Sequence, residues 1–286
     1  MLKMERGVVI YMSMVLAGLS PHPPLIIPEI GGEETKKVEK TINSLTELAQ
    51  EIKSCEPDLL ITVSPHGSVF RDAISVLDLP RLQGDFGEFG APEVEFEVKS
   101  IPGFIDQLED NAKENNLEII RLNQEKRHQF NVSLKLDHGV MVPLYYLQKA
   151  GLDIPVVAIT MGLLNYDQLY KFGSLIDETL KENDKDAVII ASGDLSHRLK
   201  PGAPAGFNPK GEEFDQRLVD LLKEEKYKKI LNIDQKLIEK AGECGLRPLI
   251  ITLGAIDSYN VKADVKSYEG PFGVGYAVAG FYQKSQ

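Results

Sequence analysis

Three of the five histidines follow directly on an apolar run that is typical of a buried strand. His22 and His66 each close a Ser-Pro-His tripeptide at the end of such a run, and His197 closes a Gly-Asp-Leu-Ser-His segment after another. Ligands of open parallel sheets bind beyond the carboxyl ends of the strands, so we expect these three imidazoles to meet in one crevice. The proline before His22 and before His66 restricts the local backbone and should aim each ring.

Two imidazoles in one crevice point to a metal centre, because imidazole nitrogen binds zinc, iron, copper and nickel. A carboxylate would complete the two-histidine, one-carboxylate face of non-haem Fe(II) oxygenases, which leaves positions open for substrate and O2. Glu243 stands out among the acids, because glycines flank its Gly-Glu-Cys-Gly segment and an apolar helix is expected just after it. Spacing alone leaves two other interpretations open, namely Glu243 as an ordinary acid at a helix start and each histidine as a structural, hydrogen-bonded residue.

Composition is that of an average globular protein, with 286 residues, 43% hydrophobic and 26% charged, which is enough for a sizeable core. The formal net charge of −11 gives the chain no electrostatic reason to bind nucleic acid or an anionic membrane. Two cysteines, Cys55 and Cys244, cannot cross-link a chain of this length, which favours a reducing cytoplasm and excludes a cysteine-rich zinc site. No apolar run reaches the roughly 18 residues of a membrane-spanning helix.

Short apolar runs alternate along the chain with longer amphipathic stretches. This alternation predicts an α/β fold, a single domain with a mostly parallel or mixed central sheet flanked by helices. Strands are expected at residues 15–19, 59–64, 73–77, 154–160, 187–191, 261–268 and 276–282, and helices at 33–53, 104–115, 140–150, 166–182, 210–223, 227–231, 234–240 and 247–259. The Gly- and Pro-containing stretch 80–102 is expected to form a short antiparallel excursion, and loop 200–209 to border a site.

The first residues are interpreted separately from the domain. Residues 7–19 are apolar and follow Lys3 and Arg6, as in a signal peptide, but no A-x-A-like cleavage site comes after them. Residues 1–14 are therefore expected to be an N-terminal leader or an over-called start, with Met12 and Met14 as alternative first residues. Residues 15–286 are expected to form the domain itself.

Taken together and in order, the motifs resemble those of a known family. They are the two Ser-Pro-His tripeptides, Asp137-His138-Gly139, Gly193-Asp194-Leu195-Ser196-His197 and Gly242-Glu243-Cys244-Gly245. This set is similar to that of the class III extradiol ring-cleavage dioxygenases, catalytic (LigB-type) subunit, and more closely to the AmmeMemoRadiSam system protein or Memo-like branch of that superfamily. The resemblance runs from about Val15 onward and implies a LigB-like (phosphorylase/hydrolase-like) α/β domain.

The resemblance also implies roles for individual residues. His22, His66 and Glu243 match the Fe(II) ligands, His197 matches the acid/base histidine, and His138 matches a second active-site histidine. In Memo-type relatives a cysteine takes the place of the carboxylate ligand, and Cys244 follows Glu243 here. We interpret Glu243 as the ligand and Cys244 as a packing residue at the helix start. His128 matches no role and is expected to be solvated.

The function implied is extradiol cleavage of a catechol-like aromatic ring with O2, dependent on Fe(II), with zinc expected to replace iron in some purified protein. His197 would accept a substrate proton and later return one, because imidazole titrates near neutral pH. Two alternatives stay open. The first is a Memo-like metal-binding or scaffold protein without dioxygenase activity, and the second is a zinc-dependent hydrolase that uses the same ligands. Besides the aromatic substrate and O2, the expected partners are a second copy of the chain in a homo-oligomer or a partner subunit.

Overall fold

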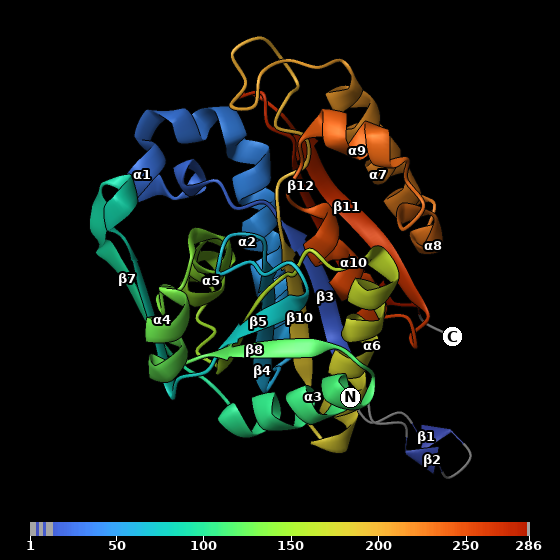
Figure 1. Cartoon of the computed structure of the whole chain (residues 1–286). Helices are drawn as coiled ribbons and strands as arrows, with labels where there is room; N and C mark the ends of the chain where they lie inside the picture. The colour runs from blue at the N-terminus through green and yellow to red at the C-terminus, as the bar shows by residue number, and fades with distance from the viewer. Residues whose placement is uncertain (1–3, 6–7, 10–13, 285–286) are drawn as a thin grey trace.

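The computed structural model of the protein describes residues 4–5, 8–9 and 14–284, so the expected leader at residues 1–14 falls largely outside the described residues. Helices pack on both faces of one central sheet (Figure 1). The sheet has eight strands in the order β11-β12-β3-β10-β4-β9-β5-β8. This mixed sheet, flanked by helices within a single domain, confirms the predicted fold class.

The centre of the sheet is parallel and buried on both faces. It consists of β3 (Met14–Ser20), β10 (Ala187–Ser192), β4 (Leu59–Ser64) and β9 (Val156–Thr160). Parallel strands covered on both faces read as continuous apolar runs, which is how these four segments read in the sequence. Their register aligns their last residues, because Ser192 pairs with Ser20 and Ser64 pairs with Thr160. The loops that leave these strands therefore start from one edge of the sheet.

The flanks of the sheet mix both strand directions. On one side β12 (Tyr276–Gln283) runs antiparallel to β3, and β11 (Val261–Glu269) runs antiparallel to β12. On the other side β5 (Ala73–Leu77) runs antiparallel to β9, and β8 (Glu118–Leu122) runs parallel to β5. Two smaller antiparallel pairs lie apart from this sheet, β1 (Met4–Glu5) with β2 (Val8–Val9) and β6 (Arg81–Phe86) with β7 (Ala91–Lys99).

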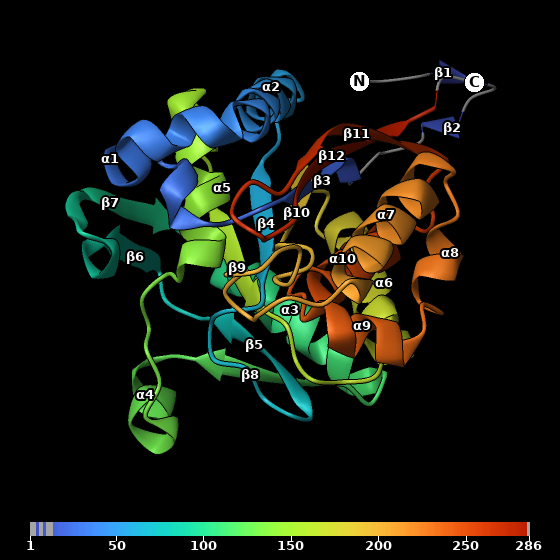
Figure 2. The same ribbon diagram turned by 90° about the horizontal axis from the view of Figure 1, so that it is seen from above.

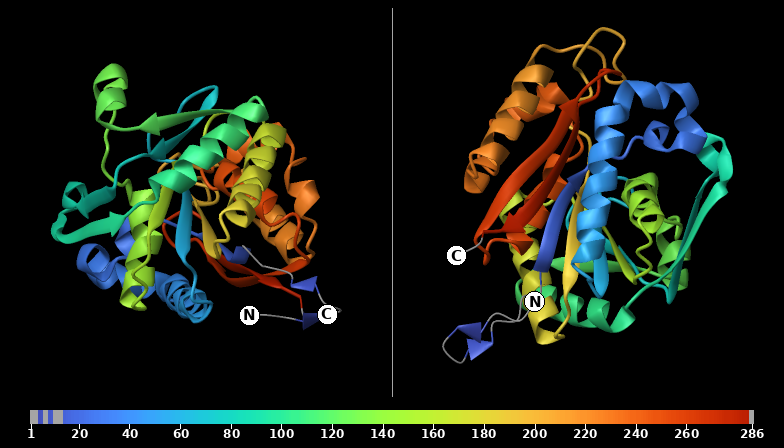
Figure 3. Two further views of the ribbon diagram at one scale, coloured as in Figure 1. Left: turned by 90° about the horizontal axis from the view of Figure 1, so that it is seen from below. Right: turned by 180° about the vertical axis from the view of Figure 1, so that it is seen from behind.

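Two apolar clusters, one on each face of the sheet, form the core. The first contains side chains of α3 (Pro102–Glu114), α6 (Tyr166–Glu182), α7 (Lys210–Lys223), α8 (Tyr227–Ile230), α9 (Gln235–Ala241) and α10 (Leu246–Ala255). The second contains side chains of α2 (Glu39–Ser54), α5 (His138–Lys149) and the β6–β7 hairpin. Figure 3 shows this hairpin beside α5, far from α7 and α9.

Most elements lie where the sequence places them, and the differences have local causes. The strands at 59–64 and 73–77 and the helices at 166–182 and 210–223 have the predicted bounds. The single helix expected at 33–53 is instead a 3-10 segment (Gly32–Val38) followed by α2, with the break at Val38, whose φ is −123°. The short helix α1 (Pro28–Gly31) precedes them and ends at Gly32, which has a positive φ of 49°. Further 3-10 turns span Pro24–Ile26 and Gly87–Phe89.

β8 and α4 (Gln124–Phe130) are among the elements that the prediction lacks, because a short edge strand and a short polar helix carry little periodicity. The predicted antiparallel excursion at 80–102 is confirmed as the β6–β7 hairpin. No helix in the described part of the chain is long and apolar enough to cross a membrane.

Candidate metal centre

Three histidines meet at the edge of the sheet where the parallel strands end. His22 follows β3, His66 follows β4 and His138 is the first residue of α5. One ring nitrogen of each lies within 4.8 Å of those of the other two, and the Nε2 atoms of His22 and His66 are 2.8 Å apart. The structure thus brings together the two histidines of the Ser-Pro-His tripeptides, and it adds His138 to them.

The start of α5 is fixed against the end of β4, which places His138 beside His66. The Asp137 carboxylate caps the helix by accepting the N–H of Gly139 at 2.8 Å, and it also accepts the Ser64 hydroxyl at 2.5 Å. Gly139 lies so close to Ser64 that a β-carbon on it would be 2.3 Å from the serine oxygen. Ser64 of the second Ser-Pro-His tripeptide and the Asp137-His138-Gly139 segment therefore form a single contact, and this contact positions the His138 ring.

Ser192, the last residue of β10, determines which nitrogen of His22 faces the cluster. Its hydroxyl donates to the carbonyl oxygen of Gly139, so its oxygen accepts from Nδ1–H of His22 at 2.9 Å. With the proton on Nδ1, Nε2 of His22 carries a free lone pair that is directed at His66. This is the tautomer that a metal ligand requires, with the second nitrogen held by a hydrogen bond.

The cluster is electrically neutral near pH 7. Burial and the neighbouring histidines lower the pKa of His22 well below its usual value, and burial lowers the pKa of His66 to about 4. Burial also lowers the pKa of His138 and of His197. Neutral imidazole is the form that binds metal ions, so the free nitrogen atoms are available at physiological pH.

Cys244 approaches His22 at Nε2, the same nitrogen that faces His66, and His197 lies beside Cys244. The Cys244 sulfur is 3.6 Å from Nε2 of His22 and 3.7 Å from Nε2 of His197, and it accepts the N–H of Asp194 at 3.2 Å. Burial raises the pKa of the Cys244 thiol well above its usual value, and the Asp194 carboxylate adds to this shift. His197 is held through its main chain, because its N–H donates to Ala241 and its carbonyl oxygen accepts from Ala205.

Glu243 does not join the three histidines, contrary to the expectation from the sequence. Its carboxylate accepts the N–H of Leu246, the first residue of α10, at 2.6 Å, and burial raises the pKa of Glu243 to about 7. The free N–H groups of a helix start attract a carboxylate, which explains why the side chain turns toward the helix. Among the described residues, the group of possible ligand atoms at this place consists of His22, His66 and His138.

The turn that carries Glu243 instead presents the next residue to the site. Gly242 has a positive φ of 61°, and the N–H groups of Cys244 and Gly245 both donate to the carbonyl oxygen of Asp194. Cys244, interpreted from the sequence as a packing residue, is therefore the member of this turn that faces the histidines. His128 lies exposed on α4, as expected for a residue without a role.

The main chain of His22 is fixed by a buried acid. Asp194 is 6% exposed, and its carboxylate accepts the N–H of His22 at 3.0 Å. Burial raises the pKa of Asp194 to about 7. No signal in the sequence distinguishes this contact, because it joins residues that are 172 positions apart.

A cavity of about 440 Å³ adjoins the cluster and has His66 and His138 in its wall. Part of its wall is apolar, with Leu77, Leu122, Leu136, Met141 and Ala158, and polar side chains such as Ser68 and Thr160 line other parts. The β6–β7 hairpin closes its outer side, so the excursion that was recognised in the sequence borders the site. A single aromatic ring with a short side chain fits a cavity of this size.

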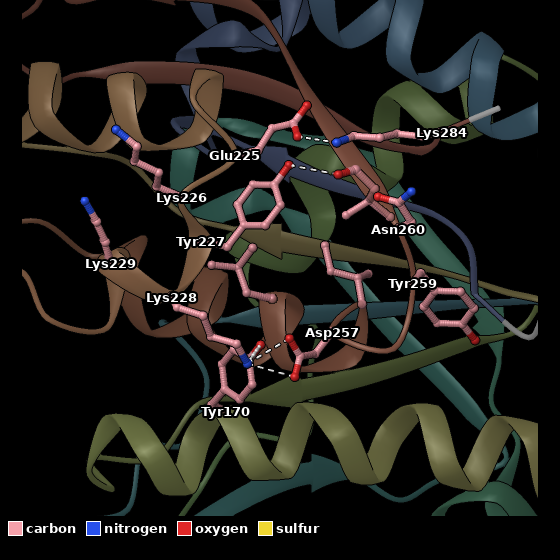
Figure 4. Close-up of a pocket in the computed structure, with 13 residues that line it drawn as sticks. Tyr170, Glu225, Lys226, Tyr227, Lys228, Lys229, Asp257, Tyr259, Asn260 and Lys284 are labelled. Carbon is pink, nitrogen blue, oxygen red and sulfur yellow. Dashed lines mark hydrogen bonds and ion pairs between the residues drawn. The ribbon is translucent and has the colours of Figure 1, made fainter. Parts of the chain in front are cut away.

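A second hollow, of about 480 Å³, lies far from the histidines between α6, α8 and α10 (Figure 4). Ion pairs neutralise much of its charge, because Lys228 contacts Asp257 at 2.8 Å and Lys284 contacts Glu225. None of the described residues that line it is a histidine or a cysteine. The groups able to hold a transition metal are therefore at the strand ends and not in this hollow.

Comparison with known proteins relates these features to a family. Residues 16–279 match the family described as "Catalytic LigB subunit of aromatic ring-opening dioxygenase". The chain is 38% identical to Protein CA_C1420 of Clostridium acetobutylicum over 260 residues, which are 91% of this chain and 56% of that protein. It is 30% identical to 3,4-dihydroxyphenylacetate 2,3-dioxygenase of Escherichia coli over 141 residues, 46% of this chain and 51% of that enzyme.

Memo-type proteins are also among the relatives. A MEMO1 family protein of Methanococcoides burtonii is 29% identical over 157 residues, 51% of this chain and 55% of that protein. The chain spans about half the length of these curated relatives. Among solved structures, the uncharacterized protein JW3007 of Escherichia coli K12 shares the fold, with a TM-score of 0.62 at 15% identity over 93% of this chain and 99% of that one.

Proposed function

We propose, because the chain belongs to the family of catalytic LigB subunits of aromatic ring-opening dioxygenases, that it is an Fe(II)-dependent oxygenase which opens the ring of a catechol-like substrate with O2. The observation that carries this proposal is the pair of Nε2 atoms of His22 and His66, 2.8 Å apart, with His22 buried and the pKa values of both rings lowered. His138 supplies a third nitrogen beside them.

The donor set fits a transition-metal ion. Two nitrogen atoms that bind one ion at about 2.1 Å lie roughly 3 Å apart when the angle at the ion is near 90°, close to the distance in the cluster. The lone pair of His22 is directed inward by Ser192, and the low pKa of His66 keeps its ring unprotonated. His22, His66 and His138 would hold the ion, while Glu243 stays at the start of α10.

When bound, Fe(II) supplies a place where the two substrate hydroxyl oxygens and O2 meet. The residues of the chain orient the ring and move protons. The apolar part of the cavity wall would pack against the ring and keep water from that face. His197 lies beyond Cys244, and its lowered pKa leaves Nε2 free to accept a proton from a substrate hydroxyl. The same nitrogen can return that proton to the product.

The proposal is tested by loading the protein with Fe(II) without oxygen and then measuring O2 uptake with a panel of catechols. Replacing His66 by Ala should remove one ligand and weaken iron binding, whereas His197→Ala should bind iron like the wild type and lose turnover by about 100-fold or more. His128→Ala is the matched control, because His128 is exposed and remote from the cluster, and it should behave like the wild type. Loss of iron in His197→Ala would contradict the assigned role.

The position of Cys244 favours a second candidate, a Memo-like metal-binding protein without ring cleavage. Its sulfur lies 3.6 Å from Nε2 of His22, where a fourth soft ligand would bind copper or zinc more tightly and leave fewer open positions. This alternative expects no O2 uptake with any catechol, and a large loss of metal affinity in Cys244→Ser. The oxygenase proposal expects Cys244→Ser to keep its iron.

A further inference from the structure

One side of the cavity beside His66 and His138 carries charged side chains and differs from the part of the wall that is apolar. Asp85, Glu88 and Phe89 of the β6–β7 hairpin line this side, together with Lys135. The Phe89 ring centroid lies 5.4 Å from that of His138, so this end of the cavity is close to the histidine cluster. Figure 2 shows the hairpin beside α5, which begins at His138.

Two of the three charges at this end cancel each other. Lys135 Nζ contacts a carboxylate oxygen of Asp85 at 2.8 Å, and the other oxygen of Asp85 accepts the N–H of Gly87 at 2.9 Å. A substrate carboxylate that approached Lys135 would have to compete with Asp85 for the ammonium group. The pair therefore offers no free positive charge to an anionic ligand.

Glu88 supplies the charge that remains. It is exposed, and within the part of the chain that the structure describes no hydrogen bond or ion pair engages its carboxylate. The next residue, Phe89, is 38% exposed. A free carboxylate beside an exposed aromatic face is the combination that binds an alkylammonium group, through charge attraction and a cation–π contact. The net charge of −11 of the whole chain acts in the same direction.

We propose that the cavity selects a catechol-like ring that carries a positively charged amine side chain, with Glu88 and Phe89 as the residues that determine this preference. The inference rests on the proposed function, because the ring is placed against the histidine cluster. The apolar part of the wall, with Leu122, Leu136 and Met141, would take the ring, and the amine would extend to Glu88. Neutral and anionic side chains of the same length would find no matching partner there.

The test measures binding to protein loaded with Fe(II) under anaerobic conditions, so that no turnover is needed. Three probes of similar size are titrated by calorimetry: 4-(2-aminoethyl)catechol, 4-propylcatechol and 3-(3,4-dihydroxyphenyl)propanoate. The amine should bind about fivefold more tightly than the neutral probe, the size expected of one exposed ion pair and one exposed cation–π contact. The anionic probe should bind most weakly, and the differences should shrink in high salt.

Variants of the hairpin connect the preference to its residues. Glu88→Gln should reduce the preference for the amine to about twofold, and Phe89→Leu should reduce it as well, with little change for the neutral probe. Glu93→Gln is the matched control, because Glu93 is exposed on the same hairpin but does not line the cavity, and it should keep the fivefold preference.

The outcomes separate this inference from the function on which it rests. If none of the three probes binds, the proposed function itself fails, and this inference fails with it. If all three bind with equal affinity, if the carboxylate probe binds most tightly, or if Glu88→Gln keeps the full preference, the proposed role of Glu88 is overturned while the proposed function stands.

Discussion

Removal of the Ser192 hydroxyl is the perturbation whose consequences follow most directly from the structure. Ser192 is completely buried, and its hydroxyl makes two hydrogen bonds, one to the Gly139 carbonyl and one from Nδ1–H of His22. In Ser192→Ala the histidine can move its proton to Nε2 and donate to Nε2 of His66, which lies 2.8 Å away. The Gly139 carbonyl oxygen and the lone pair on Nδ1 of His22 are then left without a partner, at a cost of about 1–3 kcal/mol in the free energy of unfolding.

We expect Ser192→Ala to lower the metal affinity more than the free energy of unfolding, because the ion needs a free lone pair on Nε2 of His22. In the variant, the tautomer that offers this lone pair leaves Nδ1–H buried without an acceptor. Loss of such a supporting hydrogen bond typically lowers metal affinity 10- to 100-fold, and we expect about this decrease for Fe(II) or Zn²⁺. Metal affinity is measured by competition with a chelator of known affinity, and stability by urea titration of the metal-free protein.

Thr41→Val is the control for this experiment. Thr41 is also fully buried, and its hydroxyl donates to Glu269 at 2.6 Å, on α2 and remote from the histidines. The control should lose about 1 kcal/mol of stability and keep the metal affinity of the wild type. If Ser192→Ala folds and binds metal as tightly as the wild type, the assignment of the His22 tautomer is wrong.

Two further predictions concern the turn that holds His197 and Cys244. Gly193→Ala should lower the free energy of unfolding by roughly 3 kcal/mol, because a β-carbon there would be 2.1 Å from Cα of Gly245. Stability is measured by urea titration, and a variant as stable as the wild type would refute this close contact. Asp215→Asn should change the pH dependence of stability, because burial raises the pKa of Asp215 from 3.8 to about 7. A folded-state pKa above the unfolded one means that the wild type loses stability relative to the variant as pH rises from 4 to 7, by roughly 3 kcal/mol. A difference that does not vary with pH would show that Asp215 titrates normally.

The fold and two of the three histidines of the cluster could be predicted from local sequence patterns. Apolar runs located the central strands, and the two Ser-Pro-His tripeptides placed His22 and His66 where their strands end. The structure brings these rings together because the parallel strands are in register. Periodicity and the strand-end rule are local signals, which is why they suffice for these features.

The remaining residues depend on contacts that sequence patterns do not reveal. His138 reaches the cluster because Asp137 accepts the Ser64 hydroxyl, a contact between α5 and β4. The choice between Glu243 and Cys244 depends on one turn, in which the positive φ of Gly242 and the N–H of Leu246 direct the carboxylate to the helix. A shift of this turn by one residue would exchange the places of the Glu243 and Cys244 side chains. Sequence spacing alone therefore cannot tell which of the two neighbours faces the histidines.

X-ray absorption at the iron edge tests the central claim most directly, on protein loaded with one equivalent of Fe(II) without oxygen. The account predicts a spectrum with the multiple-scattering pattern of three imidazole rings, reduced by one in each of His22→Ala, His66→Ala and His138→Ala, and unchanged in Glu243→Gln. A spectrum without imidazole scattering, or one that changes only in Glu243→Gln, would contradict the proposal that these three histidines hold the metal.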